Sequence, residues 1–456
     1  MIEKNELVKL IEDLKNPRAY IRTKAADKLV SIKDETAIPT LFSAVQKEID
    51  FIKGQYCRFL GKIKSSLGVG PLISFLLGPS ENVALEACQA LGFIDNDVKT
   101  EALIGLLNHP NRFAKLYAIH ALGAEKRLKA VPLLVNELVN EDIEIKEAVI
   151  DSLRQIGDPG AIGGLLKILH ENDDRVIYLA VYALGEIGDK VTAVKIARFL
   201  DHKNPLIRMA AVWAVTRLGD LLVLQKLFQM LAKDPSDEVR EEVCKRLTSF
   251  GGKLVVKPLF FARALDPSHN VRVYADWALK DIPLADKKAV LLGFARENDP
   301  MLRGDALLEL GKTGDPEFLE VLKHSFKTDE NEFVRACAAQ GLSFFETTDI
   351  VASLAEGLAD KESVRKRVAE SIFRRAGRSN TALALKMASG SFGKDPYIQI
   401  MGIRILDRIY GDYPLPKSVL EELENIQKAA LDQNVARELK GLFESLNKKR
   451  GQARSS

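Results

Sequence analysis

Histidine and cysteine are the side chains here best suited to holding a metal or acting as nucleophiles. The histidines are scattered, and only His170 is followed directly by a glutamate, so no metal cluster is predicted. The cysteines lie far apart without a CxxC pair, which predicts neither a disulfide framework nor a zinc module. We expect them to be small core residues. The residues concerned are His109, His120, His170, His202, His269, His324, Cys57, Cys88, Cys244 and Cys337.

Short motifs of the common enzyme classes are absent. The chain has no GxxxxGK[ST] phosphate loop, no GxSxG nucleophile elbow and no HExxH zinc helix. The sequence therefore predicts no catalytic residue, no metal and no cofactor.

An apolar position recurs along the chain at steps of 30 to 32 residues, followed by steps of 34 and 37. A second apolar position, from Leu29 to Phe443, comes eight residues later, and a mostly small residue lies halfway between. Offsets of zero, four and eight stay on one face of a helix, so each unit should pack its second helix through this face. Self-similarity at this period is typical of helical solenoids. The recurring position is Ile21, Ile52, Val83, Ala114, Ile145, Val176, Ile207, Val239, Val271, Leu302, Val334, Val364, Ile398 and Val435.

Glycine followed by aspartate marks the boundaries between units, as in IGDPGA (156–161), IGDKVTA (187–193), LGDLL (218–222) and TGDPEF (313–318). Glycine tolerates the left-handed conformation that ends a helix, and aspartate accepts backbone N–H bonds at the start of the next. We therefore expect a helix, a tight turn, a second helix and a short link in each unit.

Three segments, 121–138, 152–169 and 175–193, resemble HEAT repeats, most closely the short bacterial variety also found in phycobilin lyases. The resemblance covers nearly the whole chain and implies an all-α fold, an α-solenoid or superhelix of about fourteen HEAT-like helical hairpins. We expect one solenoid over residues 1–443, with an irregular end cap from about 380 where GDYPLP (411–416) breaks the rhythm. Residues 444–456 should be a helix end and a disordered basic tail.

A basic residue directly after the recurring apolar position is a second feature of HEAT-like proteins. In similar proteins it bonds acidic residues of adjacent turns, and Asp174, Asp234, Asp237, Asp266, Asp299 and Asp360 are the partners expected here. A phosphate-binding ladder is the alternative. The basic residues are Arg22, Lys53, Lys115, Lys146, Arg208, Arg240, Arg272, Arg303, Arg335 and Arg365.

Several families with HEAT-like repeats are enzymes. Resemblance to deoxyhypusine hydroxylases would require several His-Glu pairs, and only His170 and Glu171 form one. Resemblance to bilin lyases rests on the repeat alone. HEAT-like alkylpurine DNA glycosylases use an aromatic cleft, a carboxylate and basic residues, and Trp213, Trp277 and nearby cations could provide such a cleft.

Side chains at offsets two and six of the second helix point away from the packed face. They should be polar unless they bind a partner. They are charged in units 5, 8 and 12, but large and mostly apolar or aromatic in units 4, 6, 7 and 9. If the second helices line a concave side, these residues form a partner-binding strip long enough for an extended peptide of about nine residues. Stacking between adjacent helices is the alternative interpretation. The candidates are Leu116, His120, Tyr178, Tyr182, Met209, Trp213, Tyr274 and Trp277, with Tyr117 as an extension.

A basic segment, KESVRKRVAESIFRRAGR (361–378), provides a second candidate surface for phosphate or an acidic partner. A solvated helix face is the alternative. Its candidate residues are Arg365, Lys366, Arg367, Arg374, Arg375 and Arg378.

Composition favours a binding protein over a nucleic-acid or membrane protein. The formal net charge is only +3, and no apolar run reaches the length of a membrane span. We therefore expect a cytoplasmic scaffold or adaptor that binds a peptide or another protein of unknown identity on its concave face. A DNA- or nucleotide-handling protein that uses the same aromatics with Arg208, Arg240, Arg272 and the basic segment is the alternative, and a bilin-lyase-like subunit is a third.

Overall fold

A computed structural model describes residues 4–32, 34–188, 190–219, 221–346, 349–410, 415–430 and 432–452. Over these ranges the chain forms 28 α-helices, joined by short 3-10 helices and turns, and no strand. The helices alternate as the first and second members of fourteen hairpins, so the predicted all-α solenoid is confirmed. Most of the predicted break at GDYPLP (residues 411–414) and the last four residues of the predicted tail lie outside the described ranges.

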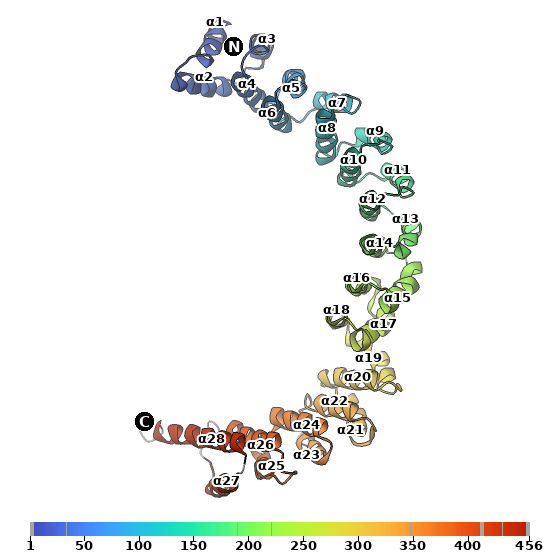
Figure 1. Cartoon of the computed structure of the whole chain (residues 1–456), viewed down its shortest axis with the longest axis vertical. Coiled ribbons are helices and arrows are strands. Elements are labelled where there is room, and N and C mark those ends of the chain that lie inside the picture. The colour runs from blue at the N-terminus through green and yellow to red at the C-terminus, as the bar shows by residue number, and fades with distance from the viewer. Residues whose placement is uncertain are drawn as a thin grey trace. The chain divides into compact units, whose positions relative to one another are not determined.

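The chain divides into two compact units, Met1–Met230 and Leu231–Ser456. Within the first unit, Figure 1 shows the second helices as the inner row of a curved array and the first helices as the outer row. The first helices are α1 (Lys4–Leu14), α3 (Ile38–Val45), α5 (Val69–Leu76), α7 (Asp97–Leu106), α9 (Val131–Glu137), α11 (Ile162–Ile168) and α13 (Lys190–Ile196). The second helices are α2 (Ala19–Ser31), α4 (Asp50–Ile63), α6 (Glu81–Gly92), α8 (Arg112–Ala124), α10 (Ile143–Ile156), α12 (Asp174–Ile187) and α14 (Pro205–Leu218).

The second unit repeats the alternation, and α15 (Leu224–Lys233) contains the boundary between the units. Its first helices are α17 (Gly252–Leu265), α19 (Leu284–Phe294), α21 (Leu319–Thr328), α23 (Ile350–Ala355), α25 (Thr381–Ala388) and α27 (Lys417–Ala429). Its second helices are α16 (Asp237–Leu247), α18 (His269–Lys280), α20 (Pro300–Lys312), α22 (Glu332–Leu342), α24 (Glu362–Arg375), α26 (Pro396–Tyr410) and α28 (Gln433–Gln452). α28 continues beyond residue 443, where we expected the solenoid to end; a single solenoid with an end cap stays a prediction.

The predicted packing face is the core of every hairpin. All fourteen recurring apolar residues are buried except Ile21, and all fourteen partners eight residues later are buried except Phe443. The residues halfway between are buried throughout, including the exceptions Tyr56 and Leu439. Each second helix therefore packs through one stripe of residues, and its opposite face is not part of the hairpin core.

Glycine and aspartate end and begin helices largely as the boundary motifs predict. Gly157, Gly219 and Gly314 adopt positive φ values of 75°, 71° and 66°, the left-handed conformation that suits glycine. Asp158 caps the 3-10 helix Pro159–Ala161 by accepting the Gly160 N–H at 2.6 Å. Gly188 is the exception: its φ of −70° and ψ of 179° are extended, so the left-handed expectation was wrong there.

Consecutive second helices pack on one another through most of each unit, but α6 and α8 have little direct contact. Polar side chains join them instead. The hydroxyl of Tyr117 on α8 donates to the Cys88 carbonyl oxygen on α6 at 3.0 Å, and burial raises the pKa of this tyrosine. Lys99 of α7, which is only 1% exposed, donates to the Leu91 carbonyl at 3.1 Å and pairs with Glu125 at 2.6 Å. Tyr117 thus bridges two helices through its hydroxyl, and its place as an extension of the strip stays a prediction.

Candidate functional site

Large side chains gather on two neighbouring second helices of the first unit, α12 and α14. Tyr178 is 38% exposed, while Tyr182, Met209 and Trp213 are half-buried. Leu206, 60% exposed, precedes Met209 and Trp213 by three and seven residues, so the three lie along one stripe of α14. We call Tyr178, Tyr182, Leu206, Met209 and Trp213 the α12–α14 surface.

The rings of Tyr182 and Trp213 stack across the two helices, with centroids 4.2 Å apart and planes inclined by 14°. Gly185 permits this approach, because a Cβ there would lie 2.5 Å from the Trp213 ring. Arg217 lies 5.5 Å above the Trp213 ring and 3.6 Å from Glu186, at one end of the surface. The alternative interpretation, stacking between adjacent helices, therefore describes this pair; the stack also holds the tryptophan in one orientation before any partner arrives.

Leu116 and His120 on α8 are not brought to the α12–α14 surface, because α10 lies between the helices. At the offsets that face the same way, α10 carries Glu147 and Asp151. Glu147 forms an ion pair with Arg175 of α12, with Oε1 and Nε 2.6 Å apart, at the edge of the surface. Leu116 is half-buried and His120 is exposed.

Tyr274 and Trp277 lie on α18 in the second unit. Trp277 is 55% exposed, and its ring meets Tyr274 of the same helix edge to face at 5.2 Å. Lys245 of α16 lies 4.1 Å above the Tyr274 ring. This pair therefore forms a separate aromatic cluster within its own unit, and a strip that joins it to α14 stays a prediction.

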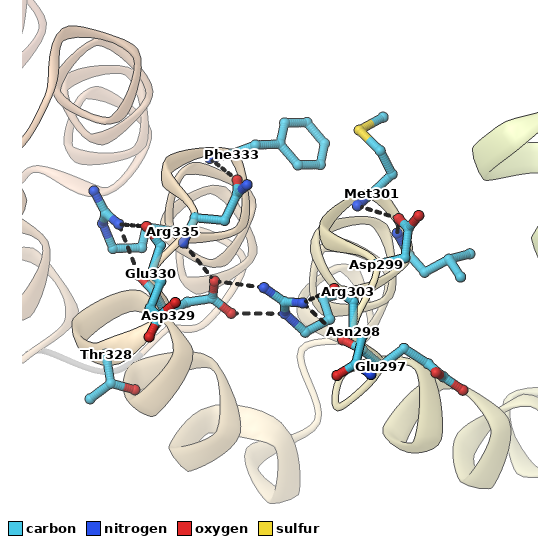
Figure 2. A network of polar contacts seen from close by, with 12 residues as sticks. Glu297, Asn298, Asp299, Met301, Arg303, Thr328, Asp329, Glu330, Phe333 and Arg335 are labelled. Carbon is cyan, nitrogen blue, oxygen red and sulfur yellow. Dashed lines mark hydrogen bonds and ion pairs between the residues drawn. The ribbon is translucent and has the colours of Figure 1, made fainter.

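Several of the basic residues after the recurring apolar position form a ladder of contacts between neighbouring turns. Figure 2 shows Arg303 of α20 reaching Asp329 at 2.9 and 3.0 Å, while the carbonyl oxygen of Asp329 accepts from Arg335 of α22 at 2.8 Å. Arg335 in turn binds both carboxylate oxygens of Asp360 at 2.7 Å. Such bidentate pairs are strong and directional. Of the expected acidic partners, Asp266 and Asp360 are confirmed, the former by Arg240 at 2.8 Å.

The cations that a DNA-handling alternative would need are engaged in the same way. Arg208 donates to the carbonyls of His202 and Lys203 at 2.9 and 3.1 Å. Arg272 donates to the Asp266 carbonyl at 2.7 Å. These guanidinium groups order the turns between helices, which favours the structural interpretation over a phosphate ladder.

The candidate basic segment on α24 is also largely occupied by contacts within the protein. Arg365 pairs with Asp395 at 3.3 Å, Lys366 with Glu362 at 2.5 Å and Arg367 with Glu370 at 3.1 Å. Arg375 lies 3.6 Å from Glu346, and Arg374 lies 5.8 Å above the Phe344 ring. Arg378 is exposed and also takes part in a contact within the chain.

The cysteines and histidines do not assemble a reactive centre among the described residues. Cys57, Cys244 and Cys337 are buried, and burial raises the pKa of each thiol to about 12, so these thiols stay protonated at neutral pH. Burial likewise raises the pKa of Cys88 to about 11. No group of three or more His, Cys, Asp or Glu in the described ranges is arranged to hold a metal ion. Nor is any helix of those ranges long and apolar enough to cross a membrane.

A buried arginine between α18 and α20 was not predicted. Arg263 of α17, whose side chain is 8% exposed, lies 3.5 Å from Asp276, 2.7 Å from Asp305 and 3.2 Å from Glu309. Its guanidinium stacks 4.6 Å from the Phe260 ring. Burial raises the pKa of Asp305 despite the arginine beside it. No repeat position carries an arginine at this point in the other hairpins, so the periodicity offered no signal for it.

The sequence analysis also missed a set of exposed apolar residues that lie directly before the recurring apolar position. Comparing the repeat units at one further residue toward the N-terminus would have found them. Figure 2 shows Met301 and Phe333 projecting to the same side from neighbouring helices. The exposed members are Tyr20, Phe51, Phe113, Leu206, Met301 and Phe333.

Comparison with known protein families identifies the same repeats that the sequence pattern predicts. A family model for HEAT repeats matches residues 100–184, 162–248 and 258–343, which together cover just over half of the chain. The chain therefore belongs to the HEAT repeat family. No match is found among curated proteins.

Three solved structures illustrate the structural similarity. Kap121p bound to RanGTP aligns with a TM-score of 0.49 and 14% identity over 97% of this chain and 56% of its own. Importin beta aligns at 0.44 and 13% identity over 96% of this chain and 74% of its own. Human deoxyhypusine hydroxylase aligns at 0.26 and 19% identity over 56% of this chain and 98% of its own. This chain spans little more than half of Kap121p, and at these scores the similarities do not bear on what it binds.

Proposed function

We propose that this protein is a scaffold that binds a segment of another protein on the α12–α14 surface. One observation carries the proposal. Two adjacent second helices place five large side chains on the face opposite their packed stripe, and two of these, Tyr178 and Leu206, remain 38% and 60% exposed. Side chains on the face of a helix opposite its packed stripe are typically charged or polar, so a cluster of large apolar side chains there favours a surface that a partner covers.

The surface has the chemistry of an interface anchor. Tryptophan and tyrosine carry large apolar areas with few rotatable bonds, and they dominate the energetics of many protein interfaces. The stack of Tyr182 on Trp213 fixes both rings, so little side-chain entropy is lost when a partner covers them. Binding, and not catalysis, is therefore the work that we assign to this face.

The partner that fits is an extended peptide with apolar side chains on one face. Packed helices lie about 8 to 10 Å apart, a distance that an extended chain covers in about three residues. Apolar side chains at alternate positions of such a peptide would cover Leu206 and Met209 on α14 and Tyr178 on α12. The ion pair between Glu186 and Arg217 at one end of the surface would meet the polar flank of the peptide.

A reducing compartment such as the cytoplasm suits this protein. Its four cysteines are free thiols, and three are buried without a disulfide. Free cysteines of this kind are common where glutathione keeps thiols reduced.

A peptide library panned against the full chain would test the proposal. Binding of the selected peptide is then measured by fluorescence anisotropy for the wild type and for Tyr178→Ala with Trp213→Phe. Loss of anchor contacts of about 2 kcal/mol should weaken binding roughly thirtyfold. Because the contacts are apolar, added salt should change the affinity little, whereas phosphate recognition would weaken steeply.

A matched control removes exposed aromatics elsewhere in the same unit. Tyr20 and Phe93 are 69% and 63% exposed, and the Tyr20→Ala/Phe93→Ala variant should bind like the wild type. Equal weakening in both variants, or none in either, would show that the peptide docks away from α12 and α14. Circular dichroism confirms that all variants fold alike.

A further inference from the structure

A basic pocket lies on the outer row of the first unit, where the ends of α11 and α13 meet. Its volume is about 430 Å³, and it is lined by Leu166, Lys167, Leu169, His170, Val194, Lys195 and Arg198. Three of the seven are cations, one is a histidine, and the other three are aliphatic. None of the lining residues is acidic.

The cations of this pocket are not neutralised by ion pairs. Among the described residues no carboxylate lies within ion-pair distance of Lys167, Lys195 or Arg198. Among the described carboxylates, the two closest in sequence are taken elsewhere: Glu171 pairs with Lys146 at 2.6 Å, and Asp201 pairs with Lys226. Arg198 instead turns toward His170, with Nη2 and Nε2 3.4 Å apart. This contrasts with α24, where most of the cations have acidic partners.

Helix ends explain only part of this charge. Lys167 and Lys195 lie in the last turns of α11 and α13, where the partial negative charge of the helix favours a cation. Each helix end supplies about half an elementary charge, so two ends offset about one of the three positive charges. An anion with more than one negative charge would neutralise the rest.

Exposed aliphatic side chains adjoin the cations. Val191 and Val194 of α13 are 64% and 55% exposed, and with Lys195 and Arg198 they follow one face of the helix and its continuation. A ligand that carries negative charge beside an apolar side chain matches both halves of the pocket.

We infer that this pocket binds a phosphorylated side chain of a partner protein, with an adjacent apolar residue of the partner resting on Val191 and Val194. A phosphate monoester carries close to two negative charges and several strong acceptor oxygens. Lysine and arginine donate to such oxygens through charge-assisted hydrogen bonds. The pocket shares no residue with the α12–α14 surface, so the inference does not depend on the function proposed for that surface.

The test uses the full chain and a fluorescein-labelled peptide of leucine and glycine with one central phosphoserine. Fluorescence anisotropy gives its dissociation constant for the wild type and for a Lys167→Gln/Lys195→Gln/Arg198→Gln variant. We expect the variant to bind about tenfold more weakly or worse, and the serine peptide to bind the wild type with a similar loss. Added inorganic phosphate should compete with the phosphopeptide.

A control of equal charge is available in the same unit. Lys47, Lys62 and Lys64 are exposed, and Lys62 also lies in the last turn of its helix. The Lys47→Gln/Lys62→Gln/Lys64→Gln variant should bind the phosphopeptide like the wild type. Equal weakening in both triple variants would overturn the inference, because it would show attraction to net charge alone.

Two further outcomes would also overturn the inference. One is equal affinity for a peptide with aspartate in place of phosphoserine, which would show recognition of any acidic segment. The other is binding to phosphatidylserine vesicles that the pocket variant abolishes, together with no binding of the phosphopeptide, which would assign the pocket to a membrane surface. Neither outcome bears on Tyr178 or Trp213, so the two proposals fail separately.

Discussion

Replacing Gly311 with alanine tests how closely α20 and α22 pack. A Cβ at residue 311 would overlap the Cα of Gly341 and lie 2.7 Å from its carbonyl carbon and oxygen. These are backbone atoms of the neighbouring second helix, so no side chain can rotate away to make room. The two helices would have to separate by about 1.1 Å before the closest contact, with the Gly341 Cα, reached an ordinary 3.4 Å.

Two opposing effects set the size of the change. Alanine is favoured over glycine inside a helix by about 0.5 to 1 kcal/mol. Overpacking a closely packed contact costs about 1 to 3 kcal/mol, and a contact between two backbones lies at the upper end. The net loss of unfolding free energy should therefore be about 2 kcal/mol, or a fall in Tm of roughly 4 to 8 °C for a unit of this size.

Gly293 provides the matched control, because it occupies the penultimate position of α19 as Gly311 does of α20. A Cβ at Gly293 would meet nothing within 4 Å. Gly293→Ala should therefore leave stability unchanged or raise it by a few tenths of a kcal/mol. Urea denaturation followed by circular dichroism measures both variants. If Gly311→Ala proves as stable as Gly293→Ala, α20 and α22 do not approach as closely as described.

Three further substitutions test polar contacts. Lys99→Met should destabilise the first unit by about 2 to 3 kcal/mol in urea denaturation, since it leaves Glu125 and the carbonyl oxygens of Leu91 and Ile94 without their donor. An unchanged midpoint would contradict the buried position. Tyr117→Phe should cost about 1 kcal/mol by losing the bond to Cys88, and a neutral result would mean that the bond to this carbonyl does not form. The hydrogen bond from Arg335 holds the pKa of Asp360 below its ordinary value, so this carboxylate stabilises the fold above about pH 4 and the contribution is lost as pH falls further. Asp360→Asn should accordingly make stability fall less steeply between pH 5 and about pH 2 than in the wild type, and identical slopes would refute the pairing.

Periodicity predicted the architecture well because burial of one stripe per helix is a local property. Ala118, Ala180 and Ala211 are buried where the pattern places them, and only Ile21 and Phe443 near the two ends are partly exposed. Residues at the chain ends have a neighbouring hairpin on one side only, so they are covered less completely.

Contacts between hairpins were harder to predict. They depend on how far apart neighbouring helices lie, and the repeat length of the sequence does not specify this distance. Tyr117 and Trp213 lie at offsets three and six of their helices, and both were assigned to the strip, yet one bridges two separated helices and the other stacks on Tyr182. Gly185 makes the stack of Trp213 on Tyr182 possible, because it lets the Trp213 ring come close to α12. Arg263 shows the same limit, since it fills a gap between α18 and α20 that no repeat position marks.

We propose above that a partner peptide covers Trp213. The chain has only two tryptophans, Trp213 and Trp277, so Trp277→Phe leaves Trp213 as the only tryptophan reporter. Its emission is recorded while the peptide selected by panning is added to this variant. We expect a shift to shorter wavelength that saturates with the dissociation constant found by anisotropy, because the half-buried ring loses its remaining contact with water on binding. Unchanged Trp213 emission at saturating peptide would contradict the claim.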